Sequence, residues 1–381
     1  MQQGQSRKGQ LGVRQFRRVY GLVALGVAAV LVAAAWAPAA EATTTSKAPP
    51  VVVKVSGNSL VDGSGNTIRL LGVDRSGTEY ACIQGWAIFD GPSDATSIAA
   101  IASWHTNAVR IPLNEDCWLG INETSADQAQ MGMVYRQAIK AYVKLLHQAG
   151  MAAILDLALT APGKEQATGA SLEPMPDQHA VTFWTEVANA FKNDPGVLFD
   201  LYNEPNNVDW PCWLSGCKVN DALSPGKTFK AVGMQTLVNA VRATGATEPI
   251  MAGGLEYASD LSQWPAGLTD PAGQLVASTH VYNNSNETEA IWDAQLAPIA
   301  AAYPIVTGEL GETDCADSFV DSYMTWADAH GVSYLGWTWD ATDASGFTCA
   351  GGPSLIVDYD GTPTPYGLGL QQHLAALASA S

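Results

Sequence analysis

The stretch HAVTFWTEVANAFKNDPGVLFDLYNE, residues 179–204, joins two segments with different periods. Residues 179–194 place apolar side chains every three to four positions, which is the pattern of an amphipathic helix. Residues 197–204 form a short apolar run that ends in polar residues, as a buried strand does. A helix that leads directly into a buried strand is typical of folds that alternate the two elements.

The same alternation continues on both sides of this stretch, where further apolar runs of strand length are separated by helical segments. Crossover helices cover the faces of a parallel sheet, and eight strand–helix units are the number that closes a (β/α)8 barrel. The sequence therefore predicts an α/β fold of the TIM-barrel type. The eight runs are IRLLGVD (68–74), AVRIPL (108–113), AAILDLAL (152–159), VLFDLYNE (197–204), PIMAGG (249–254), LVASTHVY (275–282), PIVTGEL (304–310) and SYLGWTWD (333–340). The helical segments are 93–104, 135–150, 179–194, 228–245, 317–331 and 366–379, and the helix expected after the fifth run has the weakest pattern.

The barrel is expected to occupy residues 51–381 as a single catalytic domain. Its first segment, VVVKVSGNSLVDGSGNTIRLLGV at 51–73, alternates apolar and polar residues around the turn signals SGN and DGSGN. This pattern predicts a small N-terminal β-hairpin that leads into the first buried strand. The sequence contains no tandem repeat and no second hydrophobic unit after the eighth strand and its helix, so we expect no separate binding module.

The first forty residues follow the layout of a secretory signal peptide. Five basic residues precede the apolar run LVALGVAAVLVAAAW (22–36), and the small residues APAAEA (37–42) follow it. The run is also long enough for an uncleaved N-terminal anchor, and both alternatives export the catalytic part. Residues 41–50, EATTTSKAPP, are polar and contain two prolines, so we expect a short linker. The basic residues are Arg7, Lys8, Arg14, Arg17 and Arg18.

The composition is that of an acidic globular protein. Hydrophobic residues make up 47% of the chain and charged residues 15%, which suffices for one large core and argues against general disorder. The 19 basic and 37 acidic residues give a formal charge of −18. Without residues 1–40, which contain five basic and no acidic residues, the charge is −23. Such a charge disfavours nucleic acid and anionic membranes, and it suits a neutral extracellular substrate or serves solubility alone.

Six cysteines in an exported chain indicate disulfides. The chain has no CxxC motif and no paired histidines, so neither the spacing nor the residue types indicate a zinc site, and we expect no metal. The cysteines follow expected strands, and neighbouring loops at the carboxyl end of a barrel can reach each other. We therefore predict the pairs Cys82–Cys117, Cys212–Cys217 and Cys315–Cys349.

Two glutamates are expected at the carboxyl ends of barrel strands, where the chemistry of such folds takes place. Glu204 ends the fourth run in LFDLYNEP, and Glu309 ends the seventh in PIVTGELG. Cleavage of a glycosidic bond needs one protonated carboxyl to assist the leaving oxygen and one ionised carboxylate to attack the anomeric carbon. Two carboxylates that face each other across a barrel mouth supply this arrangement.

The motifs around these glutamates resemble those of glycoside hydrolase family 5, the cellulase family of retaining β-glycanases. The similarity extends from about Val51 to Leu377, and it is carried by LLGVDRSGTEYACIQGW (70–86), AVRIPLNEDCW (108–118), FDLYNEP (199–205), HVY (280–282), VTGELGE (306–312) and YLGWTWD (334–340). The resemblance implies that Glu204 is the acid/base and that Glu309 is the nucleophile of a double displacement. It also implies endo-acting hydrolysis of a β-1,4-linked polysaccharide, with cellulose-type glucan ahead of mannan and mixed-linkage glucan.

Further residues are expected around the two glutamates. Arg110, at the end of the second run, would keep Glu309 ionised by charge pairing, and Tyr282 would donate a hydrogen bond to the same carboxylate. By the family pattern, Asn203 binds the sugar 2-hydroxyl, a contact that strengthens in the transition state. His280 shares a strand face with Tyr282 and is expected to support the acid/base residue or the sugar.

Tryptophans are expected to line the sugar-binding surface. The family pattern places Trp337 beneath the sugar at the cleavage point. Trp339 shares the strand face of Trp337 and is predicted as a subsite residue, with core packing as the alternative. Trp86 and Trp118 lie in expected loops of the catalytic face and are predicted as subsite platforms, because flat rings stack on pyranose faces.

One segment departs from the family pattern. Members usually carry a histidine at the end of the third strand, in a segment like LDLHW, whereas this chain reads LDLAL with Ala158 and Leu159. The change removes a hydrogen-bonding group and a platform near the cleavage point, so it affects substrate choice and rate. It also motivates a second hypothesis, a carbohydrate-binding pseudoenzyme. Glu312 is an alternative nucleophile, and the family pattern favours Glu309.

No cofactor is expected, since no phosphate-binding glycine motif follows a strand and the acidic residues are needed for acid/base chemistry. The expected partner is a β-linked oligo- or polysaccharide, without nucleic acid, and without a membrane once the signal peptide is cleaved. An exo-acting enzyme would need loops that close one end of the cleft, and the sequence has no long insertion of that kind. We expect a secreted, extracellular monomer.

Overall fold

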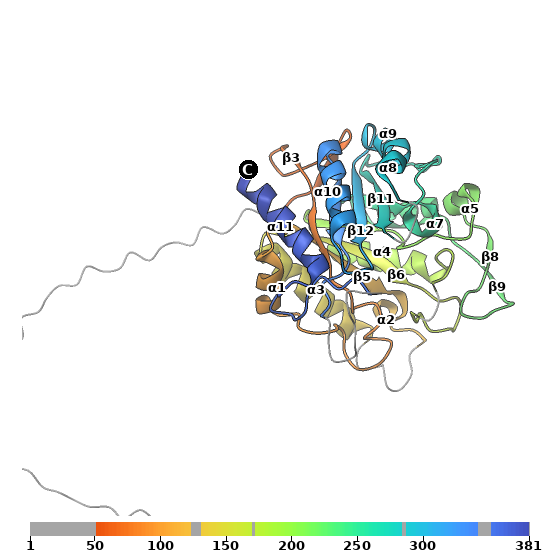
Figure 1. Cartoon of the computed structure of the whole chain (residues 1–381). Coiled ribbons are helices and arrows are strands. Elements are labelled where there is room, and N and C mark those ends of the chain that lie inside the picture. The colour runs from red at the N-terminus through yellow and green to blue at the C-terminus, as the bar shows by residue number, and fades with distance from the viewer. Residues whose placement is uncertain (1–50, 123–130, 170–171, 284–286, 342–351, 381) are drawn as a thin grey trace, which may run out of the picture. The chain divides into compact units, whose positions relative to one another are not determined.

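The computed structural model describes residues 51–122, 131–169, 172–283, 287–341 and 352–380. The predicted signal peptide and linker, residues 1–50, lie outside these ranges, as does Cys349. Within the described residues, eight parallel strands close into a barrel and helices surround them (Figure 1). The predicted (β/α)8 fold is therefore confirmed.

The barrel strands pair with their neighbours in chain order, and β13 closes the ring against β4. Several are shorter than the apolar runs that predicted them, because the polar ends of the runs belong to loops. The fourth run, for example, stops pairing at Asp200, four residues before Glu204. The barrel strands are β4 (Leu71–Asp74), β5 (Ala108–Asn114), β6 (Ala152–Leu159), β7 (Val197–Asp200), β10 (Ile250–Gly253), β11 (Leu275–Tyr282), β12 (Ile305–Gly311) and β13 (Ser333–Gly336).

Helices cover the outside of the barrel wherever the sequence has a strong helical period. The helix expected at 228–245 begins later, because Thr228–Lys230 forms strand β9 and pairs with β8 (Lys218–Asn220). The weak fifth connection contains one turn, α7 (Leu255–Ala258), instead of a full helix. No helix of the described residues is long and apolar enough to cross a membrane. The other helices are α1 (Ala95–Ala102), α2 (Glu115–Leu119), α3 (Met133–Gln148), α4 (His179–Phe191), α5 (Trp210–Ser215), α6 (Met234–Ala243), α8 (Glu289–Gln295), α9 (Ala297–Ala300), α10 (Ser318–His330) and α11 (Pro365–Ala380).

The N-terminal segment closes the amino end of the barrel. The predicted hairpin is present as β1 (Lys54–Ser56) and β2 (Ser59–Val61), and β3 (Thr67–Ile68) adds a third antiparallel strand. Val53 and Leu60 pack in one apolar cluster with barrel residues such as Ile154, Val276 and Leu335. Because the amino end is filled by side chains, the carboxyl end is the one that offers a site.

Disulfides link loops at the carboxyl end of the strands. The predicted pairs Cys82–Cys117 and Cys212–Cys217 are present, with Cα–Cα distances of 6.1 and 5.1 Å. The first joins the loop after β4 to α2, and the second closes the short connection between α5 and β8. Because Cys349 lies outside the described residues, the pair Cys315–Cys349 stays a prediction.

Candidate active site

Glu204 and Glu309 approach each other at the carboxyl end of the barrel. Glu204 lies in the loop after β7, with 17% of its side chain exposed, and Glu309 lies within β12, with 5% exposed. His280 of β11 lies between them: its Nδ1 is 3.1 Å from Glu204 Oε1 and 3.5 Å from Glu309 Oε2. One carboxylate oxygen of each glutamate and the imidazole nitrogen all lie within 4.8 Å of one another.

A bulge in β12 directs Glu309 toward this group. Thr279 pairs with Thr307 and the next residue, His280, pairs with Glu309, so Gly308 is the extra residue. Bulges of this kind re-aim side chains and are common beside active sites. The bulge places Glu309 directly opposite His280.

Arg110 and Tyr282 both contact the Glu309 carboxylate, as expected from the sequence. Arg110 Nη1 donates to Oε1 at 3.0 Å, and the Tyr282 hydroxyl donates to Oε2 at 2.6 Å. Burial and the adjacent carboxylate raise the pKa of Tyr282 well above its ordinary value, so the phenol keeps its proton. A Cβ at Gly311 would lie 2.3 Å from the Tyr282 ring, which explains why a glycine is needed there. Each Glu309 oxygen thus has a fixed donor.

Asn203 and Trp337 also lie at this end of the barrel. Asn203 Oδ1 accepts a hydrogen bond from Arg110 Nη2 at 2.8 Å, which leaves the amide nitrogen of Asn203 as the group available to donate. Trp337 directly follows β13 and is partly exposed. Its backbone N–H donates to Leu310 of the strand that carries Glu309. These two residues remain candidates for sugar contacts.

Three buried aspartates complete the surroundings of Arg110, and the sequence analysis missed them. Arg110 Nη1 lies 3.0 Å from Asp74, Nη2 lies 3.2 Å from Asp156, and Nε lies 3.0 Å from Asp200. With Glu309, four acids surround one guanidinium. Burial therefore raises the pKa of Asp74, Asp156 and Asp200 despite the opposing charge of Arg110. The sequence does contain a signal for these three residues, because an aspartate occurs in each of three apolar runs, at GVD, LDL and FDL.

The raised pKa of Asp156 predicts a pH-dependent stability. Above about pH 4 the unfolded chain releases this proton while the folded chain retains it, so the free energy of unfolding falls as pH rises. Asp156→Asn lacks this contribution. Its stability relative to wild type should increase with pH, by a slope approaching about 1 kcal/mol per pH unit. Urea unfolding between pH 4.5 and 7.5 measures the slope, and Asp360→Asn, at an exposed carboxyl, is the control. Parallel curves for wild type and Asp156→Asn would contradict the prediction.

Two of the tryptophans are in the core: the prediction of a platform at Trp118 is wrong, and for Trp339 the alternative of core packing is the one observed. Trp118 is fully buried among Tyr135, Phe183 and Phe191, and Trp339 is fully buried with its ring edge against Trp104. A ring without exposed surface cannot stack on a sugar. Trp86 is 50% exposed in the loop after β4, so the prediction of a platform there stands.

The two residues that depart from the family pattern belong to a small apolar cluster. Ala158 and Leu159, at the end of β6, pack with Ala161 and Ala167, and Leu172 and Leu223 lie against them. The side chains that stand in place of a polar and an aromatic residue are thus covered by neighbouring loops. At these two positions the chain therefore has buried apolar side chains and no hydrogen-bonding group.

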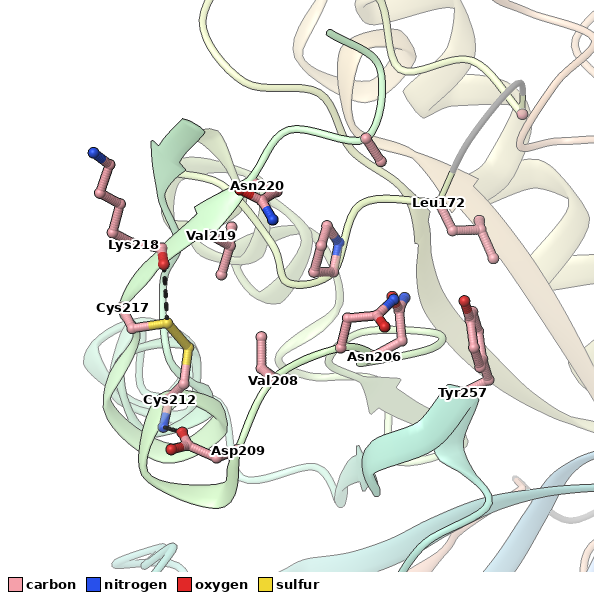
Figure 2. Close-up of a pocket in the computed structure, with 14 residues that line it drawn as sticks. Leu172, Asn206, Val208, Asp209, Cys212, Cys217, Lys218, Val219, Asn220 and Tyr257 are labelled. Carbon is pink, nitrogen blue, oxygen red and sulfur yellow. Dashed lines mark hydrogen bonds between the residues drawn. A yellow bond between two sulfur atoms is a disulfide. The ribbon is translucent and has the colours of Figure 1, made fainter. Parts of the chain in front are cut away.

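A pocket of about 1060 Å³ adjoins the loop that carries Glu204. Asn206 Nδ2 donates to the Glu204 carbonyl at 3.0 Å, and the Tyr257 backbone N–H donates to the Pro205 carbonyl at 3.1 Å. Figure 2 shows Tyr257 and Leu172 on one side of the pocket and Val208 on the other. The wall behind Val208 includes the Cys212–Cys217 disulfide (Figure 2).

Tyr257 stands out in this pocket and was not predicted from the sequence. It is 48% exposed, and it lies in three consecutive residues with positive φ, 51°, 60° and 63° for Glu256, Tyr257 and Ala258. Such conformations are costly for residues with a Cβ and persist where the surroundings determine them, often at ligand sites. Here the hydrogen bond from Thr279 Oγ1 to the Ala258 carbonyl holds the segment.

The structure combines a barrel of eight parallel strands with two carboxylates at the carboxyl end, the pair of acids that glycosidic cleavage uses. The family model described as Cellulase (glycosyl hydrolase family 5) matches residues 61–343 of this chain. The chain belongs to glycosyl hydrolase family 5, and the resemblance seen in its motifs is confirmed.

Relatives with different substrates in their names share this family. The chain is 24% identical over 297 residues to a mannan endo-1,4-β-mannosidase of Streptomyces lividans, covering 75% of this chain and 66% of that protein. It is 31% identical over 120 residues to endoglucanase 1 of Saitozyma flava, covering 28% and 30%. The chain thus spans less than two thirds of the length of either relative. A β-glucanase of Saccharophagus degradans, crystallised with cellotetraose, has the same fold with a TM-score of 0.64, 19% identity and coverage of 86% and 94%.

Proposed function

We propose that this chain is a secreted, retaining endo-β-1,4-glycanase in which Glu309 is the nucleophile and Glu204 is the acid/base. The observation that carries the proposal is the approach of the two carboxylates, whose oxygens lie within 4.8 Å of each other. Retaining enzymes separate their carboxyl groups by about 5 to 5.5 Å, whereas inverting enzymes need about 6.5 to 9.5 Å to admit a water molecule. The short separation supports the retaining mechanism.

In the first step, Glu309 attacks the anomeric carbon while Glu204 donates its proton to the leaving glycosidic oxygen. The glycosidic bond breaks, and the sugar is left covalently bound to Glu309. In the second step, Glu204 takes a proton from water, whose oxygen displaces Glu309 from the anomeric carbon. The donors from Arg110 and Tyr282 each hold one oxygen of the Glu309 carboxylate and fix its orientation for the attack.

A β-1,4-glucan is our first choice of substrate, and β-mannan is the alternative. The β-glucanase neighbour and the endoglucanase relative support the first, while the mannosidase relative supports the second. The pocket beside Glu204 lies next to the residue that would protonate the leaving group. It therefore suits sugar units that follow the cleaved bond, which is what endo-acting cleavage of a polymer requires.

The test is release of reducing sugar by purified residues 41–381 from a panel of β-glucans, β-mannans and xylan. We expect activity on a β-1,4-glucan, and loss of this activity in Glu204→Gln and Glu309→Gln. Activity on mannan alone would make β-mannan the substrate and leave the proposed mechanism unchanged. A folded protein that is inactive on every polymer would contradict the proposal and favour the carbohydrate-binding pseudoenzyme suggested by Ala158 and Leu159.

Tyr257→Ala is expected to lower kcat/KM on the polysaccharide by about tenfold, because it removes an exposed ring that can stack on a sugar after the cleaved bond. An aryl cellobioside places its small leaving group at Glu204 and does not fill the pocket, so its hydrolysis should be unchanged. Tyr257→Phe keeps the ring and is the matched control. An equal loss on both substrates would count against a sugar-binding role for Tyr257.

Export of the chain is the remaining part of the proposal. It is supported by the basic and apolar pattern of residues 1–40 and by the disulfides, which persist in oxidising compartments. Fractionation of an expressing culture, with N-terminal sequencing of the product, tests it. A mature N-terminus near residue 41 in the medium is the expected result, and retention in the membrane fraction would favour the uncleaved anchor.

A further inference from the structure

A second group of acidic and imidazole side chains lies outside the pair of catalytic glutamates. Glu115 and Asp116 begin α2, directly after β5, and Asp177 and His179 stand at the start of α4, after β6. Because β5 and β6 are neighbours in the barrel, the two loops meet. Ligand atoms of Glu115, Asp116 and His179 lie within 4.8 Å of one another.

His179 lies at salt-bridge distance from two carboxylates of this group. His179 Nδ1 lies 3.7 Å from Glu115 Oε1 and 3.4 Å from Asp177 Oδ2. The contact with Glu115 is too long for a hydrogen bond. Two ligand atoms bonded at about 2.1 Å to a tetrahedral cation stand about 3.4 Å apart.

Burial makes the carboxylates of Glu115 and Asp177 costly, and His179, with 31% of its side chain exposed, is a counter-ion for them only when it is protonated. Glu115 has no exposed surface, and neither of its carboxylate oxygens has a hydrogen-bond partner among the described residues. Asp177 is 2% exposed, and its Oδ2 likewise has no hydrogen-bond partner among the described residues. An unpaired buried carboxylate is strongly unfavourable, and bound cations are one of the ways in which proteins stabilise it.

Neighbouring backbone groups orient the ligands, as is usual around metal sites. The His179 backbone N–H donates to Asp177 Oδ1 at 2.7 Å, which leaves Oδ2 directed at the imidazole. Asp116 accepts from the Ala167 backbone N–H at 2.9 Å and from Asn122 Nδ2 at 3.1 Å. These bonds fix the orientation of the Asp116 carboxylate beside Glu115 and His179.

We propose that Glu115, Asp116 and His179 bind one divalent transition-metal ion of the Zn²⁺ class, with Asp177 adding negative charge beside it. A histidine among carboxylates favours Zn²⁺ over Ca²⁺, which prefers six to eight oxygen ligands. The ion links the loops after β5 and β6 and stabilises the fold, and it takes no part in the reaction of Glu204 and Glu309. The proposal does not depend on the proposed function. It differs from the absence of metal expected from the sequence, because these ligands come from loops about sixty residues apart rather than from one motif.

The experiment uses the purified chain without an affinity tag, stripped with a chelator and then titrated with ZnCl₂. We expect one equivalent of Zn²⁺ by elemental analysis and a rise in Tm of about 4 °C at a hundredfold excess over Kd. Glu115→Gln and His179→Ala should each abolish the stoichiometric binding. His105→Asn, at an exposed histidine outside the group, should bind Zn²⁺ like the wild type.

Absence of saturable Zn²⁺ binding by the wild-type chain would overturn the proposal, and this result does not depend on how the variants fold. Unchanged binding in both Glu115→Gln and His179→Ala would also overturn it, as would stabilisation by Ca²⁺ alone. Hydrolytic activity is not a readout, so failure of the proposed function and failure of the metal site are distinguishable.

Discussion

Glu309→Gln is expected to lower kcat on the preferred polysaccharide by a factor on the order of 10⁴ to 10⁶, because an amide cannot form the covalent glycosyl-enzyme. The amide oxygen can still accept the hydrogen bond from Arg110, and the amide N–H can donate to the Tyr282 hydroxyl, so we expect the variant to fold and to bind oligosaccharides. Initial rates of reducing-sugar release, with binding measured by calorimetry, separate the loss of chemistry from a loss of binding.

Glu312→Gln is the matched control, since Glu312 is the alternative nucleophile on the same strand end. Its Oε2 accepts hydrogen bonds from the backbone N–H groups of Phe319 and Val320 at 3.1 Å, in the first turn of α10. Glu312 therefore accepts hydrogen bonds from backbone N–H groups at the start of α10, which have no partner within the helix. We expect Glu312→Gln to retain activity within a few-fold, and a loss as large as that of Glu309→Gln would reverse the assignment of the nucleophile.

Glu204→Ala should lower hydrolysis of the polysaccharide by about 10² to 10⁴, the range for loss of a general acid/base. A substrate with an acidic aryl leaving group needs little protonation, so its first step should remain fast and the glycosyl-enzyme should accumulate. Azide is a small nucleophile that needs no base to deprotonate it, and it should restore turnover. Burst kinetics with an aryl cellobioside, with and without azide, measure both effects.

The matched comparison is Glu309→Ala under the same conditions. It lacks the nucleophile, so no burst is expected and azide cannot release an intermediate that never forms. If azide restores turnover with retained anomeric configuration in Glu204→Ala, and in that variant alone, Glu204 is the acid/base. If azide gave the retained product with Glu309→Ala instead, the roles of the two glutamates would be exchanged.

The barrel could be predicted from the sequence because its strands and helices have different periods that are visible without tertiary context. The contacts of Arg110, Tyr282 and His280 could be expected because strands set which side chains share a face. The bulge at Gly308 could not, since it depends on the register between neighbouring strands. The aspartates around Arg110 were missed because the motifs suggested a single pair of opposite charges.

Loop residues were the least predictable part of the site. Trp118 and Trp86 both occur in segments after strands, yet the first is buried against α4 and the second is exposed. Neither composition nor period distinguishes these outcomes, because burial in a loop is decided by long-range packing. Tyr257 had no signal at all, since its exposure follows from a backbone conformation that aromatic residues rarely adopt.

The most direct test of the central claim is the identity of the covalently modified residue. A 2-deoxy-2-fluoro glycoside with an activated aryl leaving group slows the second step more than the first, so the glycosyl-enzyme can be isolated and mapped by peptide mass spectrometry. The proposed mechanism predicts one sugar per chain on the peptide that contains Glu309. An adduct on another carboxylate, or an enzyme that hydrolyses the unsubstituted glycoside with inversion of configuration and forms no adduct, would contradict it.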